Sequence, residues 1–115
     1  MRYDDPTQMT VGDLVKEFDE NVHEIIELAL SVKEISIWDK AMWTLGAGVG
    51  VAGVLLAPPT GGASLLVTVA SFGLIVADAI KKVNEIRGND EIRSKLAALE
   101  ARNSELQREI RRRFP

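Results

Sequence analysis

The first residues whose types and spacing could do chemistry are three glycines, Gly48, Gly50 and Gly53. They have the G-x-G-x-x-G spacing of a dinucleotide-binding turn, in which backbone N–H groups at a helix start hold a pyrophosphate. That fingerprint needs a strand before the first glycine and a continuing helix after the last. Here an apolar helix is expected before the motif, and the pair Pro58-Pro59 follows five residues after Gly53. The pattern therefore predicts close helix packing rather than a phosphate loop.

A second candidate site surrounds the only histidine, His23. It shares a helical face with Glu20, Glu24 and Glu27, and the four side chains could bind a metal ion. A solvated acidic face is the favoured interpretation, because no second histidine and no cysteine supplies the usual ligand set. We expect no metal, no cofactor and no enzymatic activity.

Two charged features could contact ions, lipid or nucleic acid. Asp78 is the one acid at the edge of a long apolar span, where it could serve as an ion or proton site. An ion pair with Lys81 or Lys82 at a helix end is the favoured alternative. A run of basic residues near the C-terminus could contact anionic lipid or nucleic acid weakly, or form a solvated helix end. Its members are Arg111, Arg112 and Arg113.

Charge is distributed very unevenly along the 115 residues. Between Lys40 and Asp78 lie 37 residues without a charge. Residues 1–40 carry ten acids against four bases, a net −6, and residues 78–115 carry seven acids against ten bases, a net +3. The opposite signs predict that the two flanks attract each other.

The N-terminal flank predicts one long amphipathic helix, from Thr10 to about Ile35. Thr10 and Asp13 resemble a capping box, and apolar residues then recur at steps of three and four. Ser36 and Asp39 could cap a new helix, or the first helix could continue through them; the sequence leaves both open.

The charge-free segment predicts a helical hairpin, with helices over about 41–56 and 63–83. The intervening turn contains two prolines, which stop a helix, and two glycines, which let the chain reverse. The turn residues are Pro58, Pro59, Thr60, Gly61 and Gly62. Small residues that allow two helices to approach closely lie on both arms: Gly46, Gly50, Gly53, Ala70, Gly73 and Ala77.

The stretch AGVLLAPPTGGASLL, Ala52–Leu66, resembles the hydrophobic hairpin of the apolipoprotein L family. There, a glycine-rich apolar helix ends in a turn of this type before a second apolar helix. The resemblance covers about a third of the chain, residues 46–77, and implies a membrane-inserting hairpin in a mostly helical protein, as in colicin-like pore formers. This chain departs from the family in being much shorter and in lacking the further helices that cover the hairpin.

The apolar helices must be covered on every side, by lipid or by neighbouring subunits. The first arm is about 25 Å long at about 1.5 Å per residue, against roughly 30 Å for the hydrocarbon core of a bilayer. Two tryptophans could anchor it at the interface, or could pack in a core, and nearby lysines predict that both hairpin ends lie on the cytoplasmic side. The expected interface residues are Trp38, Trp43, Lys40, Lys81 and Lys82.

The C-terminal segment, after Gly88-Asn89-Asp90, has apolar residues at alternating steps of three and four. An asparagine at one a position, with leucine at d, is typical of a parallel two-stranded coiled coil. The alternative is an amphipathic helix packed on the first helix of the same chain, which the −6 and +3 flanks favour. The residues of this stripe are Leu96, Leu99, Asn103, Leu106 and Ile110.

The sequence thus predicts an all-α chain with an acidic helix (1–40), a hydrophobic hairpin (41–83, turn at 57–62) and a basic C-terminal helix (84–115). The expected function is non-enzymatic: membrane insertion of the hairpin, with homo-oligomeric assembly through the flanking helices and a lipid bilayer as partner. One alternative is a coat or scaffold subunit of a lipid-containing particle such as a virion. Another is a soluble toxin component that exposes the hairpin on triggering.

Overall fold

The structure is a computed structural model that describes residues 5–47, 61–86 and 88–113, with side chains for 5–44, 66–86 and 88–113. Over these residues all regular structure is helical, which confirms the all-α prediction. A 3-10 turn, η1, precedes four α-helices. Their bounds are η1 Pro6–Gln8, α1 Val11–Leu30, α2 Ile37–Ala47, α4 Gly61–Asn84 and α5 Asp90–Arg113.

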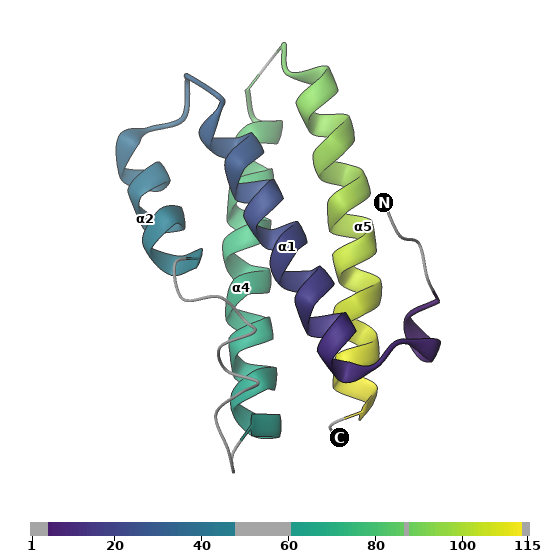
Figure 1. Ribbon diagram of the computed structural model, residues 1–115. Coiled ribbons are helices and arrows are strands. Elements are labelled where there is room, and N and C mark those ends of the chain that lie inside the picture. Colours follow the sequence, from purple (N-terminus) through teal and green to yellow (C-terminus); the bar gives the residue numbers. More distant parts are fainter. Residues whose placement is uncertain (1–4, 48–60, 87, 114–115) are drawn as a thin grey trace.

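Three long helices, α1, α4 and α5, pack against one another, and the shorter α2 packs on α1 and α4 (Figure 1). The turn η1 lies against α5, far along the chain. The two charged flanks of the sequence, which form α1 and α5, are therefore neighbours in space. Their net charges of opposite sign favour this pairing.

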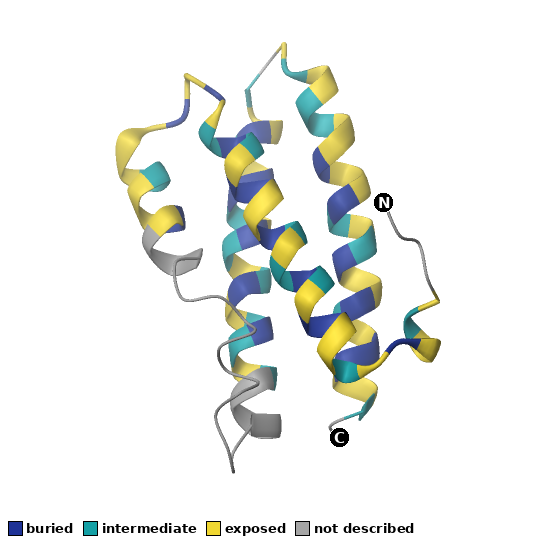
Figure 2. Cartoon of the chain, viewed as in Figure 1, coloured by how far each residue is buried: buried dark blue, intermediate teal, exposed yellow. Residues whose placement is uncertain are grey.

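The core lies between the inward faces of α1, α4 and α5 (Figure 2). Each helix contributes apolar side chains at steps of three and four, as expected for one buried stripe per helix. The buried residues of α1 are Leu14, Val15, Phe18, Val22, Ile25, Ile26 and Ala29. Those of α4 are Val69, Phe72, Val76, Ala79, Ile80 and Val83.

Helix α1 begins where the sequence predicts and ends earlier. Thr10 is the N-cap, since the backbone N–H of Asp13 donates to its hydroxyl at 3.1 Å. The prediction that the helix continues to Ile35 is wrong, because it ends at Leu30. Val32 and Ile35 continue the apolar spacing of the helix, but they are buried in the turn that follows it.

A new cap starts α2. The backbone N–H of Asp39 donates to the Ser36 hydroxyl at 3.2 Å, so the chain recaps rather than continuing as one rod. Helix α2 therefore starts at Ile37, four residues before the predicted position.

The hairpin turn differs at its second end. Helix α4 starts at Gly61, so Gly61 and Gly62 belong to its first turn and not to the predicted reversal. Three other predicted turn residues, Pro58, Pro59 and Thr60, lie outside the described residues.

The break between α4 and α5 lies where the sequence predicts it. Gly88 has a φ of +89°, a left-handed conformation that glycine adopts without a steric cost. The Arg93 guanidinium donates at 2.5 Å to the carbonyl oxygen of Ile86, which lies two residues beyond the end of α4, and this bond joins α5 to the connection before it. Acids in the first turn of α5 and arginines in its last turn complement the helix dipole.

Candidate functional site

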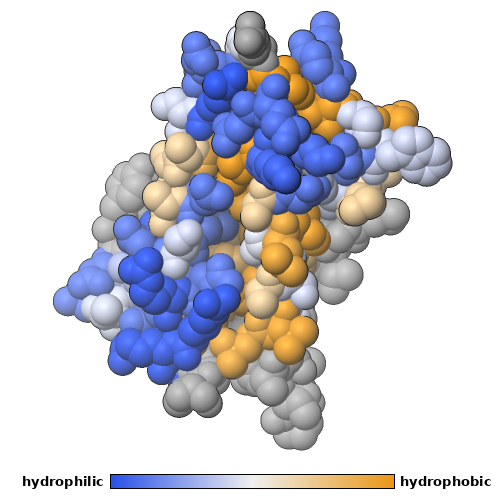
Figure 3. All heavy atoms as spheres, turned by 180° about the vertical axis from the view of Figure 1, so that it is seen from behind, coloured by the Kyte–Doolittle hydropathy of each residue, from blue (hydrophilic) through white to orange (hydrophobic). Residues whose placement is uncertain are grey.

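The exposed large hydrophobic side chains lie on two helices only, within the described residues. On α2 they are Ile37, Trp38 and Met42, with exposed fractions of 77%, 81% and 64%. On α4 they are Val67 and Leu74, at 67% and 74%. We call these five residues the apolar face. Figure 3, which views the molecule from behind, shows hydrophobic side chains in a band beside strongly hydrophilic ones.

The predicted membrane insertion of the hairpin can be compared with the length and hydropathy of the helices. Among the described residues, none of the helices combines the length and the apolar character needed to cross a bilayer. Much of the first predicted arm of the hairpin lies outside those residues.

The two tryptophans of α2 occupy different environments. Trp38 is exposed, as an interface residue would be, whereas Trp43 is buried in the core at 1% exposure. Trp43 therefore packs in the core, which was the alternative to a position at the membrane interface. Its indole Nε1 donates to Asp78 Oδ2 at 2.9 Å, so Asp78 is bonded to a tryptophan rather than to a lysine.

The lysines predicted at the interface are also placed differently from one another. Lys82 Nζ lies 3.5 Å from Asp39 Oδ2 of α2, and this ion pair replaces the one expected with Asp78. Lys81 is exposed on α4, and Lys40 is half-buried on α2.

The small residues of α4 do not form one packing face against α2. A Cβ placed on Gly73 would lie 3.3 Å from Gln107 Oε1, so this glycine faces α5. Ala77 is exposed and Ala70 is half-buried. On the first arm, Gly46 lies in α2. Gly50 and Gly53 lie outside the described residues, as does Gly48 of the dinucleotide-binding pattern.

The stripe predicted for oligomerisation is buried within the chain. Leu96, Leu99, Leu106 and Ile110 are all at most 6% exposed. Asn103, at 5%, accepts a hydrogen bond from the Asn21 side-chain amide of α1 at 2.9 Å. The last helix therefore packs on the first helix of its own chain, which is the alternative that the charge asymmetry favours.

A second α1–α5 contact is ionic. The Arg102 guanidinium binds Glu17 through two hydrogen bonds, one of them 3.0 Å long from the terminal nitrogen to Oε1. The two side chains are only 11% and 18% exposed. They lie in a groove of about 700 Å³ between the helices, whose other lining residues are mostly charged.

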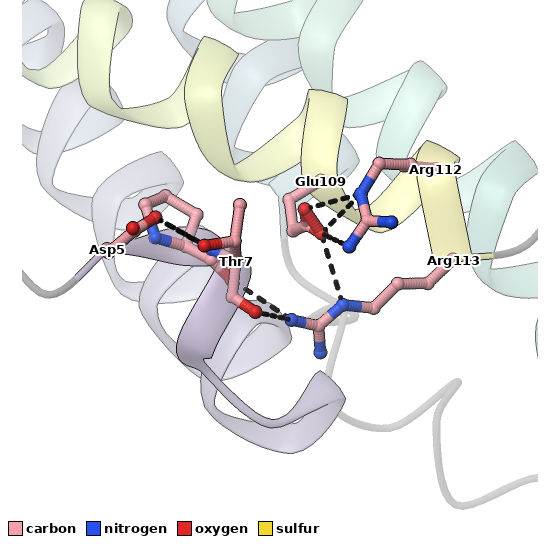
Figure 4. Close-up of polar contacts among 6 residues, drawn as sticks. Asp5, Thr7, Glu109, Arg112 and Arg113 are labelled. Atoms are coloured by element: carbon pink, nitrogen blue, oxygen red, sulfur yellow. Dashed lines mark hydrogen bonds and ion pairs between the residues drawn. The ribbon is translucent and has the colours of Figure 1, made fainter.

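Two of the three C-terminal arginines, Arg112 and Arg113, make contacts within the chain (Figure 4). Glu109 is buried and accepts hydrogen bonds from the guanidinium groups of Arg112 and Arg113, at 2.7–2.9 Å and 3.3 Å. These bonds, with that from Arg112 the stronger, hold the pKa of Glu109 below its ordinary value of 4.5. Arg113 also donates to the carbonyl oxygens of Pro6 and Thr7. Arg111 makes no such contact within the described residues and is exposed, and Arg112 is still 65% exposed, so contact of this run with anionic lipid or nucleic acid stays a prediction.

The same cluster fixes η1. The backbone N–H and the hydroxyl of Thr7 both donate to Asp5, at 3.0 and 2.8 Å. They lower the pKa of the Asp5 carboxyl, the backbone bond having the larger effect.

The acidic face around His23 holds no convergent ligand set. His23 Nδ1 lies 2.9 Å from the backbone oxygen of Asp19. No group of three or more histidine or carboxylate side chains within the described residues is arranged to bind a metal ion.

Comparison of the chain with protein families, with curated proteins and with solved structures finds no match. The resemblance to the apolipoprotein L hairpin therefore stays an expectation.

Proposed function

We propose that this protein acts without catalysis, by placing its α2–α4 side in a lipid bilayer. The observation that carries the proposal is the apolar face, five large hydrophobic side chains that are each at least 64% exposed and all lie on α2 or α4. Large apolar side chains that gather on one part of a protein surface are typical of interaction sites.

The opposite side of the molecule supports the same orientation. Helices α1 and α5 carry most of the charged residues, and their apolar stripes are buried against each other and α4. An amphipathic arrangement with one apolar and one charged side suits binding at a bilayer surface. Exposed Trp38 and Lys81 belong to the residue types that favour the membrane interface.

The expected binding energy is sufficient for a measurable effect. A large aliphatic side chain contributes about 1.5–3 kcal/mol when it moves from water to an apolar environment. Replacing two such residues by charged ones removes about 3 kcal/mol or more, which is at least a hundredfold in partition.

The test is flotation of the protein with phospholipid vesicles. We expect the unchanged chain to float and the double variant Val67→Glu/Leu74→Glu to remain in the dense fraction. The matched control is Ala97→Glu/Ser104→Glu, which adds the same charge at two exposed positions of α5 and should still float. Failure of the unchanged chain to float, or equal loss in both variants, would contradict the proposal.

A second candidate function is a coat or scaffold subunit in which the apolar face contacts other copies. Val67 and Leu74 are seven residues apart on the outer side of α4, a spacing suited to a helix–helix seam. In that case the chain forms a large oligomer in detergent-free buffer, and Leu74→Glu reduces its mass whether or not lipid is present.

A further inference from the structure

Two polar pairs join α2 to α4, one helical turn apart. Trp43 Nε1 donates to Asp78 Oδ2 at 2.9 Å, and Lys82 Nζ lies 3.5 Å from Asp39 Oδ2. Asp39 and Trp43 are four residues apart on α2, as Asp78 and Lys82 are on α4. Residues with this spacing share a helix face, so the pairs form two successive connections between antiparallel helices.

The apolar contribution of α2 to the core is small by comparison. Of its described side chains, residues 37–44, only Trp43 is buried. The other large apolar side chains within residues 37–44, Ile37, Trp38 and Met42, are exposed. Helix α1, in contrast, buries seven apolar residues. Among the described side chains of α2, one buried indole ring and the two polar pairs around it attach the helix to α4, and α2 also packs on α1.

From this arrangement we infer that the Trp43–Asp78 and Asp39–Lys82 pairs are a latch, and that its opening frees α2 to enter the bilayer. The inference rests on the proposed function, which it deepens by naming how insertion is restrained. Closed, the latch keeps the Trp43 ring in the core while Trp38 and its neighbours remain available for first contact with lipid.

The chain has two features that make the latch testable. It contains two tryptophans and no cysteine. Trp38→Phe therefore leaves Trp43 as the only indole fluorophore, and Asp39→Cys/Lys82→Cys places the only two thiols where the ion pair was. A short cleavable thiol cross-linker between them then holds α2 and α4 together.

The first arm of the experiment uses buffer alone and decides whether the pairs restrain α2. In the Trp38→Phe background, Asp78→Ala removes the acceptor, whereas Asp78→Asn keeps a side-chain oxygen that can accept from Trp43 Nε1. We expect acrylamide to quench Trp43 at least twofold more strongly in Asp78→Ala than in Asp78→Asn, with circular dichroism showing equal helix content. Equal quenching in the two variants would overturn the latch whatever the protein does with lipid.

The second arm decides whether opening is the step before insertion. Vesicles with brominated acyl chains quench an indole that reaches the hydrocarbon region. In the cross-linked Trp38→Phe protein we expect Trp43 to stay unquenched until the linker is cleaved, and then to be quenched. Quenching at the same rate before and after cleavage would overturn the inference. If the cleaved protein neither floats nor is quenched, the proposed membrane function fails instead, and the buffer arm still judges the latch.

Discussion

Asn21 and Asn103 meet across the α1–α5 interface, with the Asn21 amide donating to the Asn103 side-chain oxygen at 2.9 Å. Asn103 is buried, and its own amide nitrogen has no hydrogen-bond partner within the described structure. Asn21 is half-buried and lines the groove between the helices. The pair thus has one partner that can turn to solvent and one that cannot.

This difference predicts opposite effects of two substitutions. Asn103→Leu removes a buried unpaired donor, which costs about 1–3 kcal/mol, and should raise the melting temperature by several degrees. Asn21→Leu leaves Asn103 buried with no partner at all and should lower it. Neither change should alter the oligomer mass measured by light scattering. A change of mass in Asn103→Leu would instead support the parallel coiled coil expected from the heptad pattern.

The Glu17–Arg102 contact should be an important stabilising ion pair of α5. Both side chains are largely buried and joined by two hydrogen bonds, so Arg102→Ala leaves an unpaired carboxylate in the groove. We expect a loss of about 2–3 kcal/mol in the free energy of unfolding, as for hydrogen bonds to charged groups. Arg108→Ala, at an exposed position of the same helix, is the control and should cost less than about 0.5 kcal/mol. Equal costs in urea titrations would argue against this assignment.

Acid should weaken the cluster that joins η1 to the end of α5. The pKa of Glu109 and that of Asp5 are both lowered in the folded chain. A carboxyl whose folded pKa is lowered stabilises the fold above its unfolded pKa, and that stabilisation is lost as pH falls through the folded pKa. Stability should therefore decline below the ordinary Glu value of 4.5. In Glu109→Gln the decline between pH 5 and pH 3, followed by thermal unfolding, should be smaller; an identical slope would contradict the prediction.

Substitutions at Gly73 test whether this glycine packs on α5. An added methyl group would approach the end of the Gln107 side chain, which is flexible and can shift. Because alanine also favours a helix over glycine by about 1 kcal/mol, Gly73→Ala should leave stability unchanged or raise it slightly. Gly73→Leu should lower it, and Gly73→Leu/Gln107→Ala should recover part of the loss. No recovery in the double variant would show that Gly73 does not pack on Gln107.

The buried side of each long helix could be predicted from the sequence, because steps of three and four place apolar residues on one face. Leu96, Leu99, Leu106 and Ile110 illustrate this, since all four are buried. The same pattern could not tell what covers that face. A heptad with Asn103 at an a position suits a partner chain as well as α1, and only the packed structure distinguishes them.

Two other features could not be predicted from the sequence. The end of α1 was one, because Val32 and Ile35 lie in a turn and still continue the apolar spacing of the helix. The partners in the two polar pairs between α2 and α4 could not be predicted from the sequence. Asp39 could form an ion pair with any nearby cation, and only the placement of the helices selects Lys82. The one available signal was the i, i+4 spacing of polar residues at both edges of the charge-free segment.

Entry of the apolar face into a bilayer can be tested most directly with single cysteines introduced into this cysteine-free chain. An environment-sensitive fluorophore is attached at position 67 or 74 on the apolar face, and at position 97 or 104 on the exposed side of α5. On addition of phospholipid vesicles, we expect a blue shift and protection from an aqueous quencher at positions 67 and 74, with no change at positions 97 and 104. Unchanged emission at 67 and 74, or equal shifts at all four positions, would contradict this expectation.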